Sequence, residues 1–471
     1  MSKSGVTLGA VFAIGLAFGA EPAKPKAKVE VFADRSNGLY GANDKVEFVV
    51  KVTNPDGTPA TNGTAWVAVS NWGGKSFFGE NFDLARTANG PAAKRGVCMP
   101  KAVMLGEPGF LRCVVHYTAP GQEVWESGAV ACDPGKIKNG TERPADFDKF
   151  WDDAIENLDK TVPADIRCEK DEKASTKTHV CFRLSCATAG ENRRTWGFLA
   201  VPKEAFGGKS KSGVEVEQRK FPVRLAVPGA GPGVYWWAPQ EGAVTLTMNV
   251  FDFEPGWNVH SDWKVHYERY HEMHKRWGAK FGTREAWPAG FGSKVEDTFY
   301  YGAILGVNRL VNWLCAQPYV DKSDVSYSGQ SQGGAFGIYL ASLNTNLTAA
   351  TISEPALTGL TMHKANRTDG WPNPYNCHAN PAAKAVVEKV APYLDGVNFT
   401  PRITCRVRFG VGFIDQLCPP HCVYSAYNAL KPTVDRRMVN GVGVGHGCPK
   451  ETYEPFSEQL KDSWKAEKPS I

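Results

Sequence analysis

Over residues 28–132, apolar and polar positions alternate in short runs that are separated by turns. From Val46 to Val52 every second residue is valine or phenylalanine, which is the period of a β-strand. A turn at residues 54–57 follows, and similar runs recur at residues 64–69 and 110–115. Because the spacing of helices is missing here, the pattern predicts an antiparallel β-sandwich, which we assign to residues 21–135.

Three tryptophans of this part, Trp66, Trp72 and Trp125, have two possible roles. They can form a platform for a sugar, because a flat aromatic face stacks on a sugar ring. Large aromatic side chains are more often buried, so we interpret them as part of the core of the sandwich.

The pattern changes after a polar, turn-rich linker at residues 133–140. Residues 147–158 and, more clearly, residues 295–317 repeat apolar side chains at three- and four-residue steps, as amphipathic helices do. Runs typical of strands lie at residues 196–201, 221–227, 245–250, 325–328, 405–413 and 433–439, and a closing helix is expected at residues 455–467. Strands that alternate with helices predict an α/β domain with a largely parallel sheet over residues 136–471.

A serine stands in a tight turn between one of these strands and an apolar helix. The turn reads Gly-Gln-Ser-Gln-Gly, with Ser331 at its centre and glycines at 329 and 333. This layout is typical of a nucleophile elbow, in which a strained backbone exposes the serine hydroxyl and flanking side chains would clash. The alternative is a glycine-rich turn with an inert serine. The strand before it and the helix after it favour the elbow.

A serine nucleophile needs a base and a group that orients the base. In α/β-hydrolases the acid and then the histidine follow the serine along the chain. His446 lies in a glycine-rich loop after the last predicted strand, and Asp415 stands at the end of the strand before it. We therefore predict Ser331, Asp415 and His446 as the catalytic triad. The rival acid is Asp395, which lies before the strand at residues 405–413 rather than at its end. The rival base is His421, which we interpret as part of the local structure.

An oxyanion hole requires two preorganised N–H donors. One is expected from the backbone of Gln332, directly after the nucleophile. The other is expected from the glycine-rich loop at residues 228–233, where Ala230 is the best donor.

Charge and composition narrow the function further. The 54 basic and 49 acidic residues give a net charge of +5, which is small for 471 residues and indicates neither nucleic-acid nor membrane-surface binding. Residues 1–20 carry one charge, at Lys3, around an apolar run, and this predicts a secretory signal peptide and a secreted or periplasmic protein. The alternatives are a buried first helix or a retained membrane anchor.

The later half of the chain resembles the acetyl xylan esterase and cephalosporin C deacetylase family, carbohydrate esterase family seven. The resemblance covers about residues 142 to 467 and rests on motifs in one order: RPADFDKFW near 143–151, tyrosines at 300–301, GQSQGG at 329–334, YLDGVNF at 393–399, GFIDQLCPP at 412–420, and glycine before His446. It implies an α/β-hydrolase fold, with nucleophile, acid and base on Ser331, Asp415 and His446. It also implies hydrolysis of short, mainly acetyl, esters on xylo-oligosaccharides or similar molecules, without a cofactor.

Two departures from the family pattern stand out. The oxyanion loop of the family carries a His-Gly-Tyr type sequence, whereas this chain has Pro228, Gly229 and Ala230. The predicted β-sandwich is an addition to the usual catalytic unit and puts the ring-like hexamer of the family in doubt, so we leave the oligomeric state open.

Tryptophans gather between the oxyanion loop and the long helix, and we expect Trp236, Trp237 and Trp287 to contact the sugar. A lid packed by its own aromatic side chains is the alternative.

Other functions remain to be weighed against this one. The same triad can serve another ester or a peptide, and a hydrolase fold can bind carbohydrate without catalysis, although all three triad positions are filled here. A zinc site would use residues of suitable type, but their spacing matches no common site. Those residues are Cys418, His421, Cys422, His446 and Cys448. We therefore expect no metal.

The twelve cysteines are compatible with disulfides in an exported protein. If Asp415 and His446 meet, then Cys418 and Cys448 lie on neighbouring loops. A disulfide between them is one hypothesis, and two free, partly buried thiols are the other.

Overall fold

The computed structural model describes residues 26–87, 96–98, 100–209, 215–216, 218–231, 238–255, 263–276, 294–377 and 380–454. The predicted signal peptide, the closing helix, and Trp236, Trp237 and Trp287 lie outside these residues. The domain boundaries after residues 20 and 135 stay predictions.

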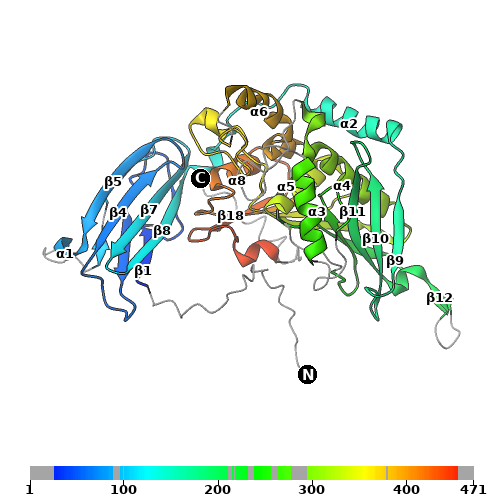
Figure 1. The fold of residues 1–471 in the computed structure, drawn as a ribbon, viewed down its shortest axis with the longest axis horizontal. Coiled ribbons are helices and arrows are strands. Elements are labelled where there is room, and N and C mark those ends of the chain that lie inside the picture. Colours follow the sequence, from blue (N-terminus) through cyan, green and yellow to red (C-terminus); the bar gives the residue numbers. More distant parts are fainter. Residues whose placement is uncertain are drawn as a thin grey trace.

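Two β-sheets form the first part of the described chain (Figure 1). One has the order β1(Lys28–Ala33), β3(Phe48–Thr53), β6(Val97–Cys98). The other has the order β2(Leu39–Tyr40), β8(Gln122–Cys132), β7(Gly109–Ala119), β4(Thr64–Ser70), β5(Ser76–Asp83), and the short α1(Leu84–Thr87) follows β5. Side chains from both sheets, such as Phe48, Val67 and Val115, share one apolar core. The strand period read from the sequence produces this arrangement, because every second side chain points into the core.

Trp66 and Trp125 lie on the same face of the five-stranded sheet, since each is paired with His116, and Trp72 lies just beyond the end of β4. Trp72 is buried, but Trp66 is 39% exposed and Trp125 is 59% exposed. The core interpretation is therefore wrong for Trp66 and Trp125. Their strands alternate, and Ala65 and Val67 take the inward positions on either side of Trp66.

The second part is built on a sheet in which nine strands are described. Its order is β19(Arg436–Gly441), β18(Arg406–Gly412), β17(Ala349–Ser353), β16(Val320–Gln330), β14(Phe221–Ala226), β15(Val244–Asn249), β11(Arg194–Pro202), β10(His179–Ala187), β9(Arg167–Asp171). Strands from β19 to β15 pair in parallel, and the last three pair antiparallel. A separate hairpin joins β12(Gly208–Lys209) and β13(Glu215–Val216). The predicted α/β fold with a largely parallel sheet is confirmed.

Helices cover this sheet. They are α2(Phe147–Thr161), α3(Trp263–Arg276), α4(Phe299–Cys315), α5(Gln332–Leu343), α6(Pro381–Leu394), α7(Gly396–Phe399) and α8(Pro420–Asn428), with 3-10 turns η1(Pro134–Lys136), η2(Lys203–Phe206), η5(Val295–Asp297), η6(Met362–Ala365), η7(Thr400–Arg402) and η8(Lys450–Tyr453). The helix predicted at residues 295–317 is η5 followed by α4, which begins where the Thr298 hydroxyl accepts a hydrogen bond from the Tyr301 N–H. Among the described residues, no helix is long and apolar enough to span a membrane.

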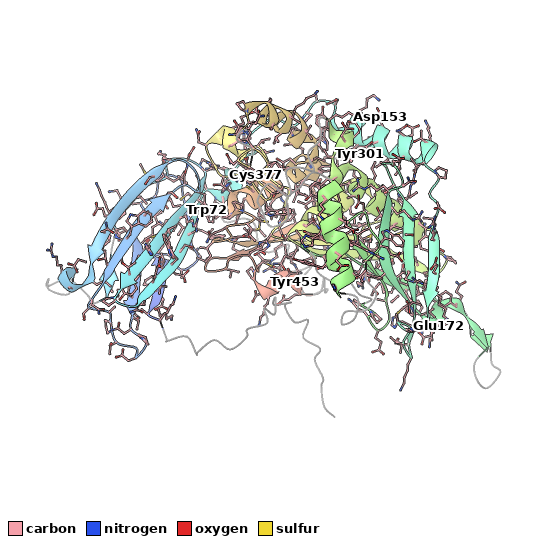
Figure 2. All side chains as sticks on the ribbon, viewed as in Figure 1. Trp72, Asp153, Glu172, Tyr301, Cys377 and Tyr453 are labelled. Atoms are coloured by element: carbon pink, nitrogen blue, oxygen red, sulfur yellow. The ribbon has the colours of Figure 1, made fainter. Side chains whose placement is uncertain are left out.

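The sandwich packs directly against the second part. Figure 1 shows β7 and β8 beside α8 and β18, and in Figure 2 Trp72 lies between the two parts. Phe110 on β7 meets Phe413 edge to face, with ring centroids 5.1 Å apart, and also contacts Tyr424 on α8. The carbonyl oxygen of Trp72 accepts a hydrogen bond of 3.0 Å from the Thr368 N–H. The first part therefore touches the segment that leads to Asp415.

Candidate active site

Ser331 stands at a sharp turn between β16 and α5. Its backbone has φ 58° and ψ −120°, a conformation that residues other than glycine rarely adopt. The turn is crowded on its inner side, since a Cβ on Gly333 would lie 2.0 Å from the carbonyl oxygen of Val227 at the end of β14. The structure thus has the tight strand-turn-helix geometry predicted for a nucleophile elbow.

Hydrogen bonds from neighbouring segments fix this turn. The Ser331 N–H donates to the carbonyl oxygen of Ser353, at 3.0 Å, and its own carbonyl oxygen accepts from the N–H groups of Ala335 and Ala356, each at 3.0 Å. The Tyr327 hydroxyl donates to the carbonyl oxygen of Gly333, at 2.5 Å. Because the backbone of Ser331 is tied to β17 and to α5, its strained conformation is held in the folded protein.

Asp415 lies in the loop after β18 and is fully buried. Its Oδ1 accepts hydrogen bonds from the N–H groups of Leu417 and Cys418, at 2.8 and 3.0 Å. Its Oδ2 lies 2.8 Å from Nδ1 of His446. The carboxylate is thus held by its own loop in a position where it can orient the imidazole.

His446 lies in the loop after β19, and its side chain is 24% exposed. Since the partner of Nδ1 is a carboxylate, Nδ1 carries the hydrogen and Nε2 is left with a lone pair that can take a proton. Burial lowers the pKa of His446, but the hydrogen bond to Asp415 and the charges of Asp415 and Glu354 outweigh burial and raise the pKa above its ordinary value.

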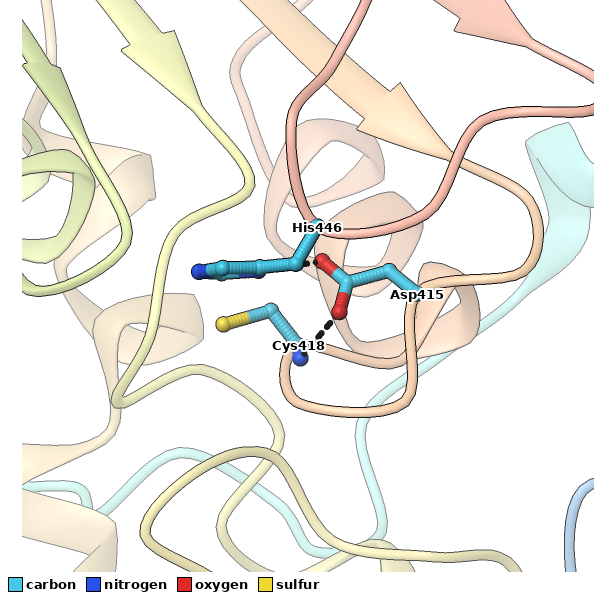
Figure 3. A group of neighbouring side chains, drawn as sticks. All are labelled: Asp415, Cys418 and His446. Carbon is cyan, nitrogen blue, oxygen red and sulfur yellow. Dashed lines mark hydrogen bonds and ion pairs between the residues drawn. The ribbon is translucent and has the colours of Figure 1, made fainter. Parts of the chain in front are cut away.

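Cys418 completes the cluster around these two residues (Figure 3). Ligand atoms of Asp415, Cys418 and His446 lie within 4.8 Å of one another. In Figure 3 the sulfur and the distal ring nitrogen point to the same side, away from Asp415. The Ser331 side chain lies next to the Cys418 thiol. The elbow, the acid and the base therefore meet around this sulfur.

The predicted oxyanion donors lie at the same edge of the sheet. Gln332 is the first residue of α5, so its N–H is one of those that a helix leaves without an intrahelical acceptor. The loop before Ala230 approaches the nucleophile, since a Cβ on Gly229 would lie 4.0 Å from the Cβ of Ser331. Both donors stay predictions, and this arrangement is consistent with them.

The rival residues are engaged elsewhere. Asp395 accepts hydrogen bonds from the N–H groups of Gly359, Leu360 and Val397, and burial raises its pKa to about 6. His421 is fully buried, its Nε2 is 2.7 Å from the carbonyl oxygen of Thr368, and burial lowers its pKa to about 4. These two side chains serve local structure, as we expected for His421.

Two of the five residues of the hypothetical zinc cluster, Cys418 and His446, lie together with Asp415. Of the others, His421 and the Cys422 sulfur lie beside the carbonyl oxygen of Thr368, the sulfur at 3.6 Å. Cys418 and Cys448 are free thiols. The Cys448 sulfur lies 3.7 Å from the carbonyl oxygen of Pro449 and interacts with the side chains of Ser353 and Thr452.

One residue of the site has no sequence signal that we used. Glu354 directly follows β17, is fully buried, and lies 3.9 Å from Nδ1 of His446. The only hint is its place after an apolar strand, the same place that Asp415 has after β18. Strand order was needed to see that these ends are neighbours, because the carboxyl ends of parallel strands meet at one edge.

Comparison with known proteins agrees with this geometry. The model of the family described as "Acetyl xylan esterase (AXE1)" matches residues 289–465, which contain Ser331, Asp415 and His446. The acetyl esterase Axe7A of Xylanibacter ruminicola is 27% identical over 412 residues, which are 86% of this chain and 80% of that protein. The predicted resemblance to the acetyl xylan esterase family is confirmed, and the chain is a carboxylic ester hydrolase.

Two solved structures of acetyl xylan esterases share the fold. Acetyl xylan esterase 1 from Thermoanaerobacterium sp. JW/SL YS485 has a TM-score of 0.52 and 18% sequence identity. The match covers 70% of this chain and 96% of that chain. The acetyl xylan esterase from Paenibacillus sp. R4 has a TM-score of 0.53 and 19% sequence identity. The match covers 71% of this chain and 98% of that chain. The predicted α/β-hydrolase fold is confirmed.

Proposed function

We propose that this protein is a serine carbohydrate esterase that removes acetyl groups from acetylated xylan, xylo-oligosaccharides or similar small esters through an acyl-enzyme. The observation that carries the proposal is the 2.8 Å contact between His446 and Asp415 beside the strained Ser331. The match to the acetyl xylan esterase family and the similarity to a protein named acetyl esterase support acetyl as the acyl group.

In the first half of the reaction, Nε2 of His446 takes the proton of the Ser331 hydroxyl as the oxygen attacks the acetyl carbonyl carbon. The new C–O bond turns the carbonyl oxygen into an oxyanion, which the N–H groups of Gln332 and Ala230 stabilise at the positive end of α5. His446 then gives the proton to the sugar oxygen, the ester bond breaks, and the acetyl group remains on Ser331.

In the second half a water molecule replaces the sugar. His446 takes a proton from water, the hydroxide attacks the acetyl-serine, and acetate leaves as the serine recovers its proton. Asp415 keeps its charge throughout and stabilises the imidazolium that forms in each half. No step requires a cofactor.

The substrate is an acetylated oligosaccharide or polysaccharide, and we propose that Trp236, Trp237 and Trp287 contact its sugar rings. These residues lie outside the described chain, so this part of the proposal stands on their place in the sequence between the oxyanion loop and α4. Ala230 replaces an aromatic residue of the family pattern beside the acyl site. We further propose that the protein is exported after removal of residues 1–20, has no membrane anchor in its mature form, and can form oligomers.

Acetate release tests the proposal. Wild-type protein is incubated with acetylated xylo-oligosaccharides, other acetylated sugars and peptide substrates, and acetate is measured enzymatically. We expect acetate release from the acetylated sugars, and a rate of release at least about 1000-fold lower for Ser331→Ala. The circular dichroism spectrum of this variant should match that of the wild-type protein. Release that is unchanged in Ser331→Ala would remove the serine mechanism, and cleavage of peptides alone would replace the substrate.

A further inference from the structure

Glu354 connects the two loops on which the proposed chemistry depends. It follows the last residue of β17, and its backbone N–H donates to the carbonyl oxygen of Gly410 on the neighbouring β18, at 2.9 Å. Its φ is 41°, in the left-handed region that non-glycine residues seldom adopt. A strained residue of this kind persists only where the surrounding structure holds it, and such residues gather at functional sites.

The carboxylate of Glu354 accepts hydrogen bonds from both sides of the site. Oε1 accepts from the N–H groups of Gly447, at 2.9 Å, and of Cys448, the two residues directly after His446. Oε2 accepts from Nε2 of Gln330, at 3.0 Å, the residue directly before Ser331. One fully buried side chain thus holds the strand end before the nucleophile and the loop after the base.

We propose that Glu354 is a positioning residue of the esterase, which fixes the His446 loop against the Ser331 turn and acts as a second carboxylate on the imidazole. The inference rests on the proposed function and adds to the triad a residue that does not touch the substrate. Asp415 orients the ring through Nδ1, while Glu354 holds the backbone that carries the ring. Its Oε2 also lies 3.9 Å from the same Nδ1.

The charges around His446 come from three loops. Asp415 and Cys418 face it from the loop after β18, Glu354 from the end of β17, and Cys448 lies two residues along its own loop. Tyr453 on η8 interacts with Glu354 and Cys448. Burial raises the pKa of Glu354, as does the charge of Asp415, whereas the N–H donors of Gly447 and Cys448 oppose this shift.

These contacts explain why a carboxylate occupies this place. In its contacts with Gln330, Gly447 and Cys448 the side chain of Glu354 is always the acceptor, and an ionised carboxylate is a pure acceptor. A negative charge next to the imidazole also favours its protonated form, which arises each time Ser331 is activated. Removing the charge while keeping the shape should therefore lower the pKa of His446, and removing the side chain should also release the loop.

The test compares Glu354→Gln and Glu354→Ala with wild type on p-nitrophenyl acetate between pH 4 and 9. The base must be neutral, so activity falls below the pKa of His446. We expect Glu354→Gln to move the acid limb of kcat/KM down by about one pH unit. We expect Glu354→Ala to lose about 10- to 100-fold in kcat with little change in KM, because misplacement of the base affects the chemical step. Glu354→Asp, which keeps the charge, should keep the wild-type midpoint.

Asp369→Asn is the matched control. Asp369 is also a buried carboxylate next to a histidine, with Oδ2 2.8 Å from Nδ1 of His363, but that histidine is outside the triad. This variant should lose stability without moving the acid limb. An acid limb that is identical in wild type and Glu354→Gln, together with a kcat within twofold of wild type in Glu354→Ala, would overturn the inference.

A second readout needs no substrate and so separates this inference from the proposed function. The pKa of His446 is measured by NMR on protein with labelled histidine, with the signal assigned by its absence in His446→Ala. A lower pKa in Glu354→Gln than in wild type supports the inference, and an equal pKa overturns it. Failure of the proposed function appears separately, as absence of acetate release by the wild-type protein.

Discussion

At the scale of single residues, the site is an arrangement of groups whose protonation is set by burial and by neighbouring charge. Two carboxylates, Asp415 and Glu354, flank the imidazole of His446. The thiol of Cys418 also lies close to this imidazole, because Cys418 follows Asp415 in the same loop. Burial raises the pKa of this thiol well above its usual range, and the charges of Asp415 and Glu354 add to the effect.

This pKa predicts that Cys418 resists alkylation although it lies beside the nucleophile. Iodoacetamide reacts with thiolates, and a raised pKa leaves the thiol protonated at pH 8. Full burial also keeps the reagent away from this sulfur. We expect the native protein to keep its esterase activity, and to label Cys418 only after unfolding in guanidinium. Mass spectrometry of digests taken over time checks this. Loss of activity in step with labelling of Cys418 would show that the thiol is reactive.

At the scale of elements, one edge of the sheet supplies the whole site. Ser331 follows β16, Glu354 follows β17, Asp415 lies after β18 and His446 after β19. These four strands are neighbours and parallel, so their carboxyl ends lie side by side. Each strand end therefore places one group of the site, and the loops need to span only short distances.

The same elements show what the sequence could predict. The glycines around Ser331 and the strand before it indicate an elbow, because few other residues fit so tight a turn. Asp415 could be predicted because it ends a clear apolar strand, and Glu354 follows one too. Nothing local distinguishes a strand-end carboxylate that holds a loop from one that faces solvent, so only the neighbouring strands reveal the role of Glu354. Likewise, Trp66 and Trp125 could not be placed, because alternation defines two faces without saying which is buried.

At the scale of the whole molecule, the β-sandwich supports the loops of the acid and the base. Phe110 is 1% exposed and packs on Phe413, two residues before Asp415. Gly38, with φ 63°, lies against Val442 in the loop that leads to His446, and a Cβ there would be 3.0 Å from the Val442 side chain. The first part of the chain is therefore in contact with both loops, although it contributes no group to the proposed reaction.

This packing predicts that Phe110→Ala affects catalysis as well as stability. Removing a buried phenylalanine costs about 3–5 kcal/mol in the free energy of unfolding. Because the lost ring supports Phe413, we also expect kcat to fall about tenfold in the folded protein, with a smaller change in KM. Denaturant unfolding and steady-state kinetics at a temperature where the variant is folded measure the two effects.

Phe48→Ala is the control for this prediction. Phe48 is 2% exposed and lies in the core of the sandwich, away from Phe413. It should cost similar stability and leave kcat near wild type. Equal kcat values for Phe110→Ala, Phe48→Ala and wild type would show that the sandwich does not position the acid.

The proposed reaction depends most on Ser331, which must be an activated nucleophile. An organophosphate such as diisopropyl fluorophosphate reacts covalently with a serine whose proton is removed by a neighbouring base. Mass spectrometry of the labelled and digested protein gives the site and the extent of reaction. We predict one adduct per chain, on the peptide that contains Ser331, absent in Ser331→Ala and formed at least about 100-fold more slowly in His446→Ala. An adduct on another residue, or labelling of Ser331 at the same rate without His446, would contradict the account.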